Sequence, residues 1–535
     1  MSNETLPRGW RTARVEDLAT LVQYGSSSKT SEDETGVPVL RMGNIVNGRL
    51  VFEALKYLPP EHQEFPELLL RPGDVLFNRT NSPELVGKTA VYSAEHPSPC
   101  SFASYLIRLR LRDYEPSLFA AYVNSGYGRA WIRSCVSQQV GQANVSGGKL
   151  RELQVPVPPR NEQRRIVAKL ETLQARSRRA REALDAVPPL LEKLRQSILA
   201  AAFRGDLTKD WRAKNKDVEP ASKLLERIRA ERRKKWEESE LAKLKAKGKP
   251  PTDDKWKSKY KEPVPVDTPR LPELPQGWCW ISIETAGDVL LGRRRAAQEY
   301  VAGRDGRVMR SYVRVANVKE DRLDLSDVLE MPFNDVELGL YRLLPGDIIL
   351  SEGQSPELVG QSAVFKGEVE DLCIQATVHR FRAYSSGTSS AFAQLVFLNH
   401  LHSRVFMRAS SLTTNIAHLT SERLKPLPFP LPPMAEQAEI VRRVRKVLER
   451  TNGIATHASQ LRSREKSLST AIVAKAFRGE LVPQDPSNAS AQGMLTRSET
   501  TTSGAANGGT SVSRESRRRA TRSTIVAATG EERQS

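Results

Sequence analysis

The chain has 535 residues, 39% hydrophobic and 27% charged, which is enough for two or more domains with cores of their own. It has no apolar run long enough to cross a bilayer and no basic-then-apolar signal at its start, which predicts a cytoplasmic location. The formal net charge of +19 favours a polyanionic partner, and nucleic acid is the leading candidate.

The first region, residues 1–157, carries short apolar runs separated by Pro-Gly and Gly, which predict short strands and turns in a mixed α+β domain. The segment SPELVG, Ser82–Gly87, follows one of these runs. Its Ser-Pro predicts a turn and its Leu-Val predicts a strand that faces the core. Residues 271–431 have the same texture, and SPELVG recurs there at Ser355–Gly360.

This recurrence belongs to a duplication of one large unit, because several further segments match in the same order in both halves. The matching pairs are LPRGW with LPQGW, RPGDVLFNRTNSPELVGKTAV with LPGDIILSEGQSPELVGQSAV, PPRNEQRRIV with PPMAEQAEIV, and AFRGDL with AFRGEL.

Residues 158–205 and 432–481 change texture: glycine nearly vanishes, and apolar residues recur every three or four positions, which predicts two long helices. Ten positions in each follow a strict 4,3 spacing, the seam of a coiled coil, although two amphipathic helices packed separately on their own domains are the alternative. Pro188-Pro189 predicts a kink or a restart of the first helix. The seam positions are Ile166, Leu170, Leu173, Ser177, Ala180, Leu184, Val187, Leu191, Leu194 and Ile198, and then Ile440, Val444, Val447, Thr451, Ile454, Ala458, Leu461, Glu465, Leu468 and Ile472.

Two further segments stand apart. Residues 206–270 predict a highly charged helix followed by a proline-rich run, with Trp236, Trp256 and Tyr260 among the cations. We expect a linker or a protein contact there, with contact to a nucleic-acid backbone as the alternative. Residues 482–535 are rich in Ser, Thr, Gly and Ala and are expected to be disordered.

Motifs for catalysis and metal binding are missing from the sequence. There is no GxxxxGK phosphate loop, no Asp/Asn-Pro-Pro-aromatic motif of amino-methyltransferases, and no CxxC spacing among the four cysteines. Asp74, Glu84 and Lys88 faintly suggest a nuclease cluster, but the second half replaces the lysine with Gln361. We therefore expect no catalytic residues, no metal and no cofactor on this chain.

Taken together, two variable α+β regions, each followed by PP-x-x-EQ-x-x-IV and a long helix ending in AFRGxL, resemble the DNA-specificity subunit of type I restriction-modification systems. The resemblance spans residues 6–481. It implies an α+β fold with an internal pseudo-two-fold repeat, in which two similar mixed α/β target recognition domains are separated by two long antiparallel coiled-coil helices.

The same resemblance implies a division of labour. Each recognition domain reads one half of a bipartite site on double-stranded DNA, and the helices dock two modification subunits. Methyl transfer and cleavage then belong to the modification and restriction/translocase subunits, which carry S-adenosylmethionine, ATP and Mg. About 40 helical residues would hold the recognition domains roughly 60 Å apart.

Candidate DNA contacts lie where the halves differ, such as NRTN against SEGQ before SPELVG, because Arg, Asn and Gln pair with base edges. The conserved RMGN and RVAN segments suit phosphate contact or a structural turn, and the segments around residues 144–150 and 415–420 either reach DNA or cap a helix. GRRRAAQ, 292–298, is a basic loop suited to phosphate. The candidates are Arg41, Asn44, Arg79, Asn81, Lys88, Ser146, Lys149, Arg293, Arg294, Arg314, Asn317, Gln354 and His418.

A second set of residues is predicted to form subunit or helix interfaces at the ends of the long helices. They are Glu162, Gln163, Ile166, Leu170, Phe203, Glu436, Gln437, Ile440, Val444 and Phe477. The alternative functions are a stand-alone DNA-binding scaffold or regulator and, behind it, an enzyme of an unrecognised type. Adjacent genes for a methyltransferase and a translocase-nuclease would favour the specificity subunit over these two alternatives.

Overall fold

The computed structural model describes residues 6–139, 142–246, 251, 253–294 and 307–485. The chain mixes helices and strands and divides into two compact units. Unit 1 comprises Met1–Arg181 with Ser463–Ser535, and unit 2 comprises Glu182–Arg462. Both units therefore contain parts of both predicted long helices.

Unit 1 is built on a four-stranded antiparallel sheet in the order β2-β11-β7-β9, flanked by smaller sheets in the orders β10-β3-β6, β12-β13-β8, β1-β14 and β4-β5. Its four main strands include the short apolar runs expected from the sequence. The strands are β1 (Arg11–Arg14), β2 (Ala19–Tyr24), β3 (Val37–Leu40), β4 (Ile45–Val46), β5 (Arg49–Leu50), β6 (Lys56–Leu58), β7 (Val75–Asn78), β8 (Thr80–Asn81), β9 (Thr89–Val91), β10 (Ser101–Phe102), β11 (Leu106–Leu111), β12 (Ser137–Gln139), β13 (Gln142–Asn144) and β14 (Gln154–Val157).

Unit 2 contains the same five sheets in the same order of strands, with β16-β25-β21-β23 as the main sheet. The smaller ones are β24-β17-β20, β26-β27-β22, β15-β28 and β18-β19. The strands are β15 (Cys279–Ser282), β16 (Gly287–Leu291), β17 (Val308–Val313), β18 (Val318–Lys319), β19 (Arg322–Leu323), β20 (Leu329–Phe333), β21 (Ile348–Ser351), β22 (Gly353–Gln354), β23 (Ser362–Val364), β24 (Cys373–Ile374), β25 (Val378–Ala383), β26 (Ser411–Thr413), β27 (Ile416–His418) and β28 (Pro428–Leu431).

Short helices cover the sheets in each unit and fill the cores with side chains such as Phe119 and Phe392. In unit 1 they are α1 (Val15–Leu18), α2 (Pro116–Asn124), α3 (Gly126–Cys135) and α4 (Gly147–Glu152). In unit 2 they are α6 (Lys209–Lys214), α7 (Ala221–Ala246), α8 (Ile283–Ala286), α9 (Asp335–Tyr341), α10 (Ser390–His402), α11 (Val405–Ala409) and α12 (Ser421–Leu424).

The SPELVG segments form turns, and the prediction of a strand for Leu-Val is wrong. The Ser82 carbonyl accepts hydrogen bonds from the backbone of both Leu85 and Val86, which closes a helical turn. Val86 is buried beneath it, whereas Leu85 is 39% exposed. Gly87 then leaves the turn with φ +83°, and a Cβ there would meet the side chain of Ile132. Packing of this turn on α3 explains the glycine.

The aspartate of each Pro-Gly-Asp segment anchors the main sheet. Asp74 is 1% exposed, accepts from the backbone of Arg71, and pairs with Arg110 at 2.6 Å. Asp347 repeats this arrangement with Arg382 in unit 2. Asp74 is thus a turn-forming residue held in a buried ion pair, which accounts for its repetition without any catalytic role.

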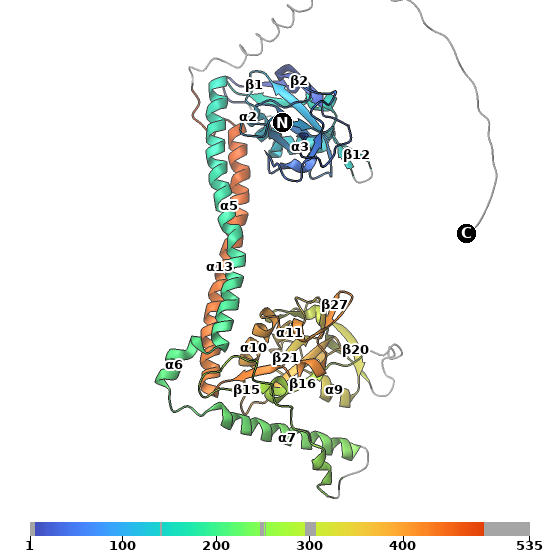
Figure 1. Cartoon of the computed structure of the whole chain (residues 1–535), viewed down its shortest axis with the longest axis vertical. Helices are drawn as coiled ribbons and strands as arrows, with labels where there is room; N and C mark the ends of the chain where they lie inside the picture. The colour runs from blue at the N-terminus through green and yellow to red at the C-terminus, as the bar shows by residue number, and fades with distance from the viewer. Residues whose placement is uncertain (1–5, 140–141, 247–250, 252, 295–306, 486–535) are drawn as a thin grey trace, which may run out of the picture. The chain divides into compact units, whose positions relative to one another are not determined.

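The long helices α5 (Arg160–Phe203) and α13 (Met434–Phe477) have 44 residues each and lie side by side (Figure 1). In unit 1, Ser177 and Arg181 both donate to Glu465. Within unit 2, Arg462 contacts Asp185 and Arg195 contacts Asn452, so the two segments run antiparallel there as well.

The strict 4,3 seam is wrong in part. Side chains at several predicted seam positions are exposed, whereas neighbours one residue later, such as Arg181 and Ala455, are partly buried. The other fifteen predicted positions, including both ends of each series, are buried or partly buried, so the 4,3 spacing holds along both helices with five exposed exceptions. The exposed predicted positions are Ala180, Leu194, Ile454, Leu461 and Leu468.

The prediction that the first helix restarts at Pro188-Pro189 is also wrong. Helix α5 continues through both prolines, whose positions are exposed. Packing of α13 on both sides of this point, through Asp185 and Arg195, stabilises the continuous helix although two backbone hydrogen bonds are lost.

The charged linker forms α7, whose buried residues Ala221, Leu224 and Ile228 belong to the core of unit 2. The following segment folds back on it. Trp256 stacks on Trp236 with ring centroids 6.0 Å apart. Tyr260 also contacts Trp236, with ring centroids 5.4 Å apart, so Trp236 is the ring that both of the others meet. Residues 486–535, most of the tail predicted to be disordered, lie outside the described residues.

We predict that Gly360→Ala destabilises unit 2. Gly360, the counterpart of Gly87, has φ +80°, and an added Cβ would lie 2.3 Å from the ring of Phe406. Strain and overpacking together should lower the free energy of unfolding by about 2–4 kcal/mol, measured by denaturant titration. Gly339→Ala is the control, since a Cβ there meets nothing within 4 Å. Equal stability of the two variants would refute this account of the turn.

Candidate nucleic-acid interface

One small three-stranded sheet in each unit, β12-β13-β8 in unit 1 and β26-β27-β22 in unit 2, brings together candidate contacts that are far apart in the sequence. In unit 1, β8 pairs with β13, so Asn81 lies opposite Ala143. In unit 2, β22 pairs with β27, which places Gln354 opposite Ala417 and beside His418. Strands β12 and β26 complete these sheets. We take the two sheets as the candidate interface.

Arg79 directly precedes β8, and both its backbone N–H and its carbonyl form hydrogen bonds, whereas its guanidinium forms none with the described residues. Its N–H donates to the Tyr105 carbonyl at 2.9 Å, and its carbonyl accepts from Val145 at 2.9 Å. The guanidinium carbon lies 4.9 Å from the centre of the Tyr24 ring. Among the described residues, none forms a hydrogen bond or ion pair with this guanidinium. Cation–π contact therefore orients a cation with donors to spare.

Glu352 occupies the same place in unit 2. Its N–H donates to the Thr377 carbonyl at 3.0 Å, and its carbonyl accepts from Leu419 at 2.8 Å. The carboxylate lies 3.4 Å from Nδ1 of His418, a predicted contact whose side chain is 36% exposed. The backbone pattern of Arg79 is thus kept while the charge is reversed.

Asn81 and Gln354 follow these positions and use their side chains alike. The amide oxygen of Asn81 accepts from the backbone of Ser82 at 2.8 Å, and that of Gln354 accepts from Ser355 at 3.2 Å. In both, the oxygen stabilises the start of the SPELVG turn. The amide nitrogen is the group left for a ligand.

Other candidates in unit 1 lie close to this sheet but have structural roles. Ser146 caps α4 by accepting from the backbone of Lys149 at 3.2 Å, so the predicted helix cap is confirmed. The ammonium of Lys149 donates to the Cys135 carbonyl. Lys88 follows the SPELVG turn and is partly exposed.

The RMGN and RVAN segments form structural turns, one of the two roles considered for them. Asn44 is 4% exposed, and its amide donates to Val51 and Glu53 carbonyls. Asn317 is 2% exposed and repeats this arrangement. Arg41 and Arg314 precede them; Arg41 donates to the Ala54 carbonyl at 2.8 Å, and Arg314 pairs with Asp327 at 2.5 Å.

The basic segment peculiar to unit 2 is only partly on the surface. Arg293 is 5% exposed, lies over the Phe333 ring and pairs with Glu337 at 2.9 Å. This places Arg293 in the interior, where a phosphate could not reach it. Arg294 is exposed, and the rest of GRRRAAQ, 295–298, lies outside the described residues.

The predicted interface residues at the helix ends are buried within the chain rather than presented on its surface. Glu162, Gln163, Ile166, Leu170, Phe203, Glu436, Gln437, Ile440, Val444 and Phe477 are all at most 8% exposed. They form one joint in each unit, where the start of one long helix meets the end of the other. These side chains therefore pack the long helices against each other and against the adjoining domain, which is the helix-interface role predicted for them.

The glutamine of each EQ motif ties its helix to the adjoining domain. Gln163 accepts from the backbone of Glu115, which precedes α2, and donates to the Pro158 carbonyl. Gln437 accepts from Ser389, which precedes α10, and donates to the Gly387 carbonyl. The two joints are therefore built by the same hydrogen bonds.

The glutamate holds the end of the opposite helix. Glu436, at the start of α13, accepts from Thr208 and Arg212, which follow α5, at 2.6 and 2.5 Å. Its other oxygen accepts from the Trp278 indole at 2.8 Å. In unit 1, Glu162 accepts from Gln484 at 2.6 Å instead of an arginine, and burial raises the pKa of its carboxyl.

The glycine of each AFRGxL segment completes the joint. Gly205 and Gly479 have φ +79° and +73°, and added Cβ atoms would lie 2.2 Å from Pro275 and 2.4 Å from Pro7. These prolines belong to the LPQGW and LPRGW segments. All three repeated motifs thus meet at one place in each unit, with the helix end supplied by the other half of the sequence.

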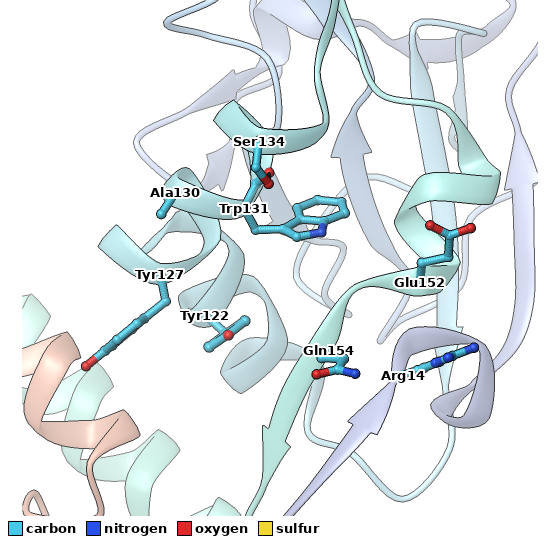
Figure 2. Close-up of a pocket in the computed structure, with 8 residues that line it drawn as sticks. All are labelled: Arg14, Tyr122, Tyr127, Ala130, Trp131, Ser134, Glu152 and Gln154. Carbon is cyan, nitrogen blue, oxygen red and sulfur yellow. Dashed lines mark hydrogen bonds between the residues drawn. The ribbon is translucent and has the colours of Figure 1, made fainter. Parts of the chain in front are cut away.

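A pocket in unit 1 lies beside its joint (Figure 2). Tyr122 and Tyr127 stack there with ring centroids 6.2 Å apart, and the edge of Tyr122 packs on Phe477. Arg14 and Glu152 line the pocket, whereas the candidate DNA contacts do not. Within the described ranges, no cluster of three or more His, Cys, Asp or Glu is placed to hold a metal ion, and no helix is long and apolar enough to span a membrane.

Sequence reasoning missed three residues of the candidate interface. Tyr24 and Tyr105 are 43% and 48% exposed beside Arg79, and Glu352 contacts His418. Both tyrosines lie far from β8 in the chain, so only the pairing of strands reveals them. Glu352 could have been found, because it aligns with Arg79 in the repeat.

A family model described as type I restriction modification DNA specificity domain matches residues 7–184 and 338–461, more than half of the chain. The chain therefore belongs to the family of type I restriction-modification specificity subunits. It is 25% identical over 494 residues to the type I restriction enzyme StySPI specificity subunit of Salmonella potsdam, covering 90% of this chain and 92% of that one. The EcoKI specificity subunit of Escherichia coli is 24% identical with the same coverage.

Solved structures agree in fold. A chain from a study of complex assembly and conformational transition of the type I R-M system aligns with TM-score 0.60 and 19% identity, covering 90% of this chain and 100% of that one. The HsdS subunit from Thermoanaerobacter tengcongensis aligns with TM-score 0.50 and 18% identity, covering 90% and 99%. At these identities the likeness establishes the fold alone.

We predict that Glu436→Gln and Glu162→Gln differ in their effect. Glu436→Gln leaves the guanidinium of Arg212, 22% exposed, without its carboxylate and should lower the free energy of unfolding by about 3 kcal/mol. Glu162 has a folded-state pKa above its unfolded one, so its contribution to stability falls as pH rises, and Glu162→Gln removes this dependence. It should cost little at neutral pH. Calorimetric unfolding measures the free energy of unfolding of each variant. If both variants lost the same stability at neutral pH, the hydrogen-bond partners assigned to Glu436 and Glu162 would be contradicted.

Proposed function

We propose that this chain is the sequence-specific DNA-binding subunit of a type I restriction-modification complex, in which each unit reads one half of a bipartite target. The observation that carries the proposal is the pair of small sheets, where one scaffold recurs with Arg79 in one copy and Glu352 in the other. A repeated scaffold with different polar side chains suits two different half-sites on duplex DNA.

The organisation of the chain follows the same proposal. Residues 1–157 and 271–431 act as recognition domains, related by a pseudo-two-fold repeat, and 158–205 and 432–481 act as helical spacers. The chain itself holds no cofactor and transfers no methyl group. S-adenosylmethionine, ATP and Mg are bound by the partner subunits, which are two modification subunits and the restriction/translocase subunits.

A modification subunit would dock on an apolar face of the helix pair in unit 2. Leu190, Leu194, Ile454 and Leu461 are 61%, 44%, 51% and 50% exposed. Leu190, Leu194 and Ile454 each precede a partly buried residue, and Leu461 lies two turns beyond Ile454. The three partly buried residues are Leu191, Arg195 and Ala455. In two antiparallel helices, the residues one position before the inward-facing residues project to the same side of the pair. These side chains therefore form one face. Contiguous exposed apolar surface marks a protein interface.

The decisive experiment maps methylated positions in DNA after the full chain is expressed with its methyltransferase partner. Exchange of residues 1–157 for those of a relative should change one half of a bipartite target and leave the other half intact, because the fold of each unit is complete around its own core. A change in both halves would contradict separate reading. Methylation by the purified chain alone would contradict its non-catalytic role.

The docking face gives a further prediction. Leu190→Glu combined with Ile454→Glu should weaken binding of the methyltransferase subunit about tenfold or more, because charges would be buried against an apolar partner. Isothermal titration calorimetry measures the affinity, and circular dichroism checks the fold. Lys193→Glu changes charge at an exposed position of the same helix and is the control. Unchanged affinity in the double variant would exclude this face.

A further inference from the structure

The two small sheets place side chains of opposite hydrogen-bonding character at one position of a shared scaffold. Arg79 and Glu352 have the same pair of backbone hydrogen bonds, so their side chains leave the chain at equivalent points. The flanking Asn81 and Gln354 are matched in role. The difference between the sheets is therefore concentrated in the charged residue and its immediate support.

In unit 1 this group is purely a donor. The Arg79 guanidinium has five N–H groups and no acceptor. Its support is fixed, because the hydroxyl of Tyr24, over whose ring the guanidinium carbon lies, accepts from the Gly147 backbone at 2.7 Å. Paired N–H groups of a guanidinium match the O6 and N7 acceptors of guanine in the major groove.

In unit 2 this group is an acceptor. Nδ1 of His418 lies 3.4 Å and 3.5 Å from the two oxygens of Glu352, and it donates to them in the tautomer that leaves Nε2 as an acceptor. Gly353 permits this contact, since a Cβ there would lie 3.2 Å from Nδ1. Carboxylate and imidazole acceptors match an exocyclic amino group, as on cytosine N4 or adenine N6.

We infer that Arg79 specifies a guanine in the half-site read by unit 1, and that Glu352 with His418 specifies a base bearing an exocyclic amine in the half-site read by unit 2. This rests on the proposed function and assigns a base chemistry to each half. The two half-sites therefore differ at this position by an exchange of acceptor for donor.

The experiment uses the full chain assembled with its methyltransferase partner and a library of duplexes randomised across both half-sites. Arg79→Gln should remove the preference for guanine at one position of one half-site, by about 5- to 150-fold, and favour adenine there. Arg79→Lys keeps the charge for folding and should weaken the same preference. Glu352→Arg should replace cytosine or adenine with guanine at one position of the other half-site.

Matched controls are Arg112→Gln in unit 1 and Glu330→Arg on β20 in unit 2, both at exposed positions outside the two sheets of the candidate interface, and neither should alter any base preference. If the wild-type complex selects a bipartite site but the Arg79 and Glu352 variants select the same bases, this inference is overturned while the proposed function stands. If the wild-type complex selects no sequence at all, the proposed function itself fails.

Discussion

The buried carboxylate of Glu436 is the interaction on which the architecture depends, because it joins parts of the chain that neither half could bring together alone. It lies at the start of α13, yet its donors Thr208 and Arg212 follow α5, and a third, Trp278, opens the second repeat. A buried carboxylate must be fully hydrogen-bonded to be tolerated. Both helices are therefore fixed to the same domain at this point, and Glu162 fixes the reciprocal pair in unit 1.

The repeat made much of the fold predictable from sequence, since two copies that agree at glycines, prolines and apolar runs report the same local structure twice. The short strands β7 and β21 and the turn at Asn44 follow from such agreement. Agreement could not show whether a shared polar residue is buried or exposed. Glu162 and Gln163 were predicted at a subunit or helix interface, but only the tertiary contact with the other helix and the adjoining domain shows that both are buried within the chain.

The helix seam shows a second limit. Residues at 4,3 spacing predict a coiled-coil seam, and fifteen of the twenty predicted positions are buried or partly buried. The pattern could not show the local departures, where a neighbour such as Arg181 is partly buried instead, or where Ile454 and Leu461 are exposed. These exposed apolar side chains belong to the face proposed above for docking, since contiguous exposed apolar surface is typical of protein interfaces.

Under the proposed function, a duplicated domain can acquire two specificities because the residues that support the fold differ from those proposed to contact DNA. At Arg79 and Glu352 the backbone is fully satisfied by neighbouring strands, so the side chain can change without unpairing a buried group. The adjacent SPELVG turn cannot vary in this way, because Gly87 and Gly360 are required by packing on α3 and α11. The identical SPELVG turns therefore lie next to Arg79 and Glu352, which differ between the halves. Each turn fixes the position of this residue, and the fold does not restrict which side chain it carries.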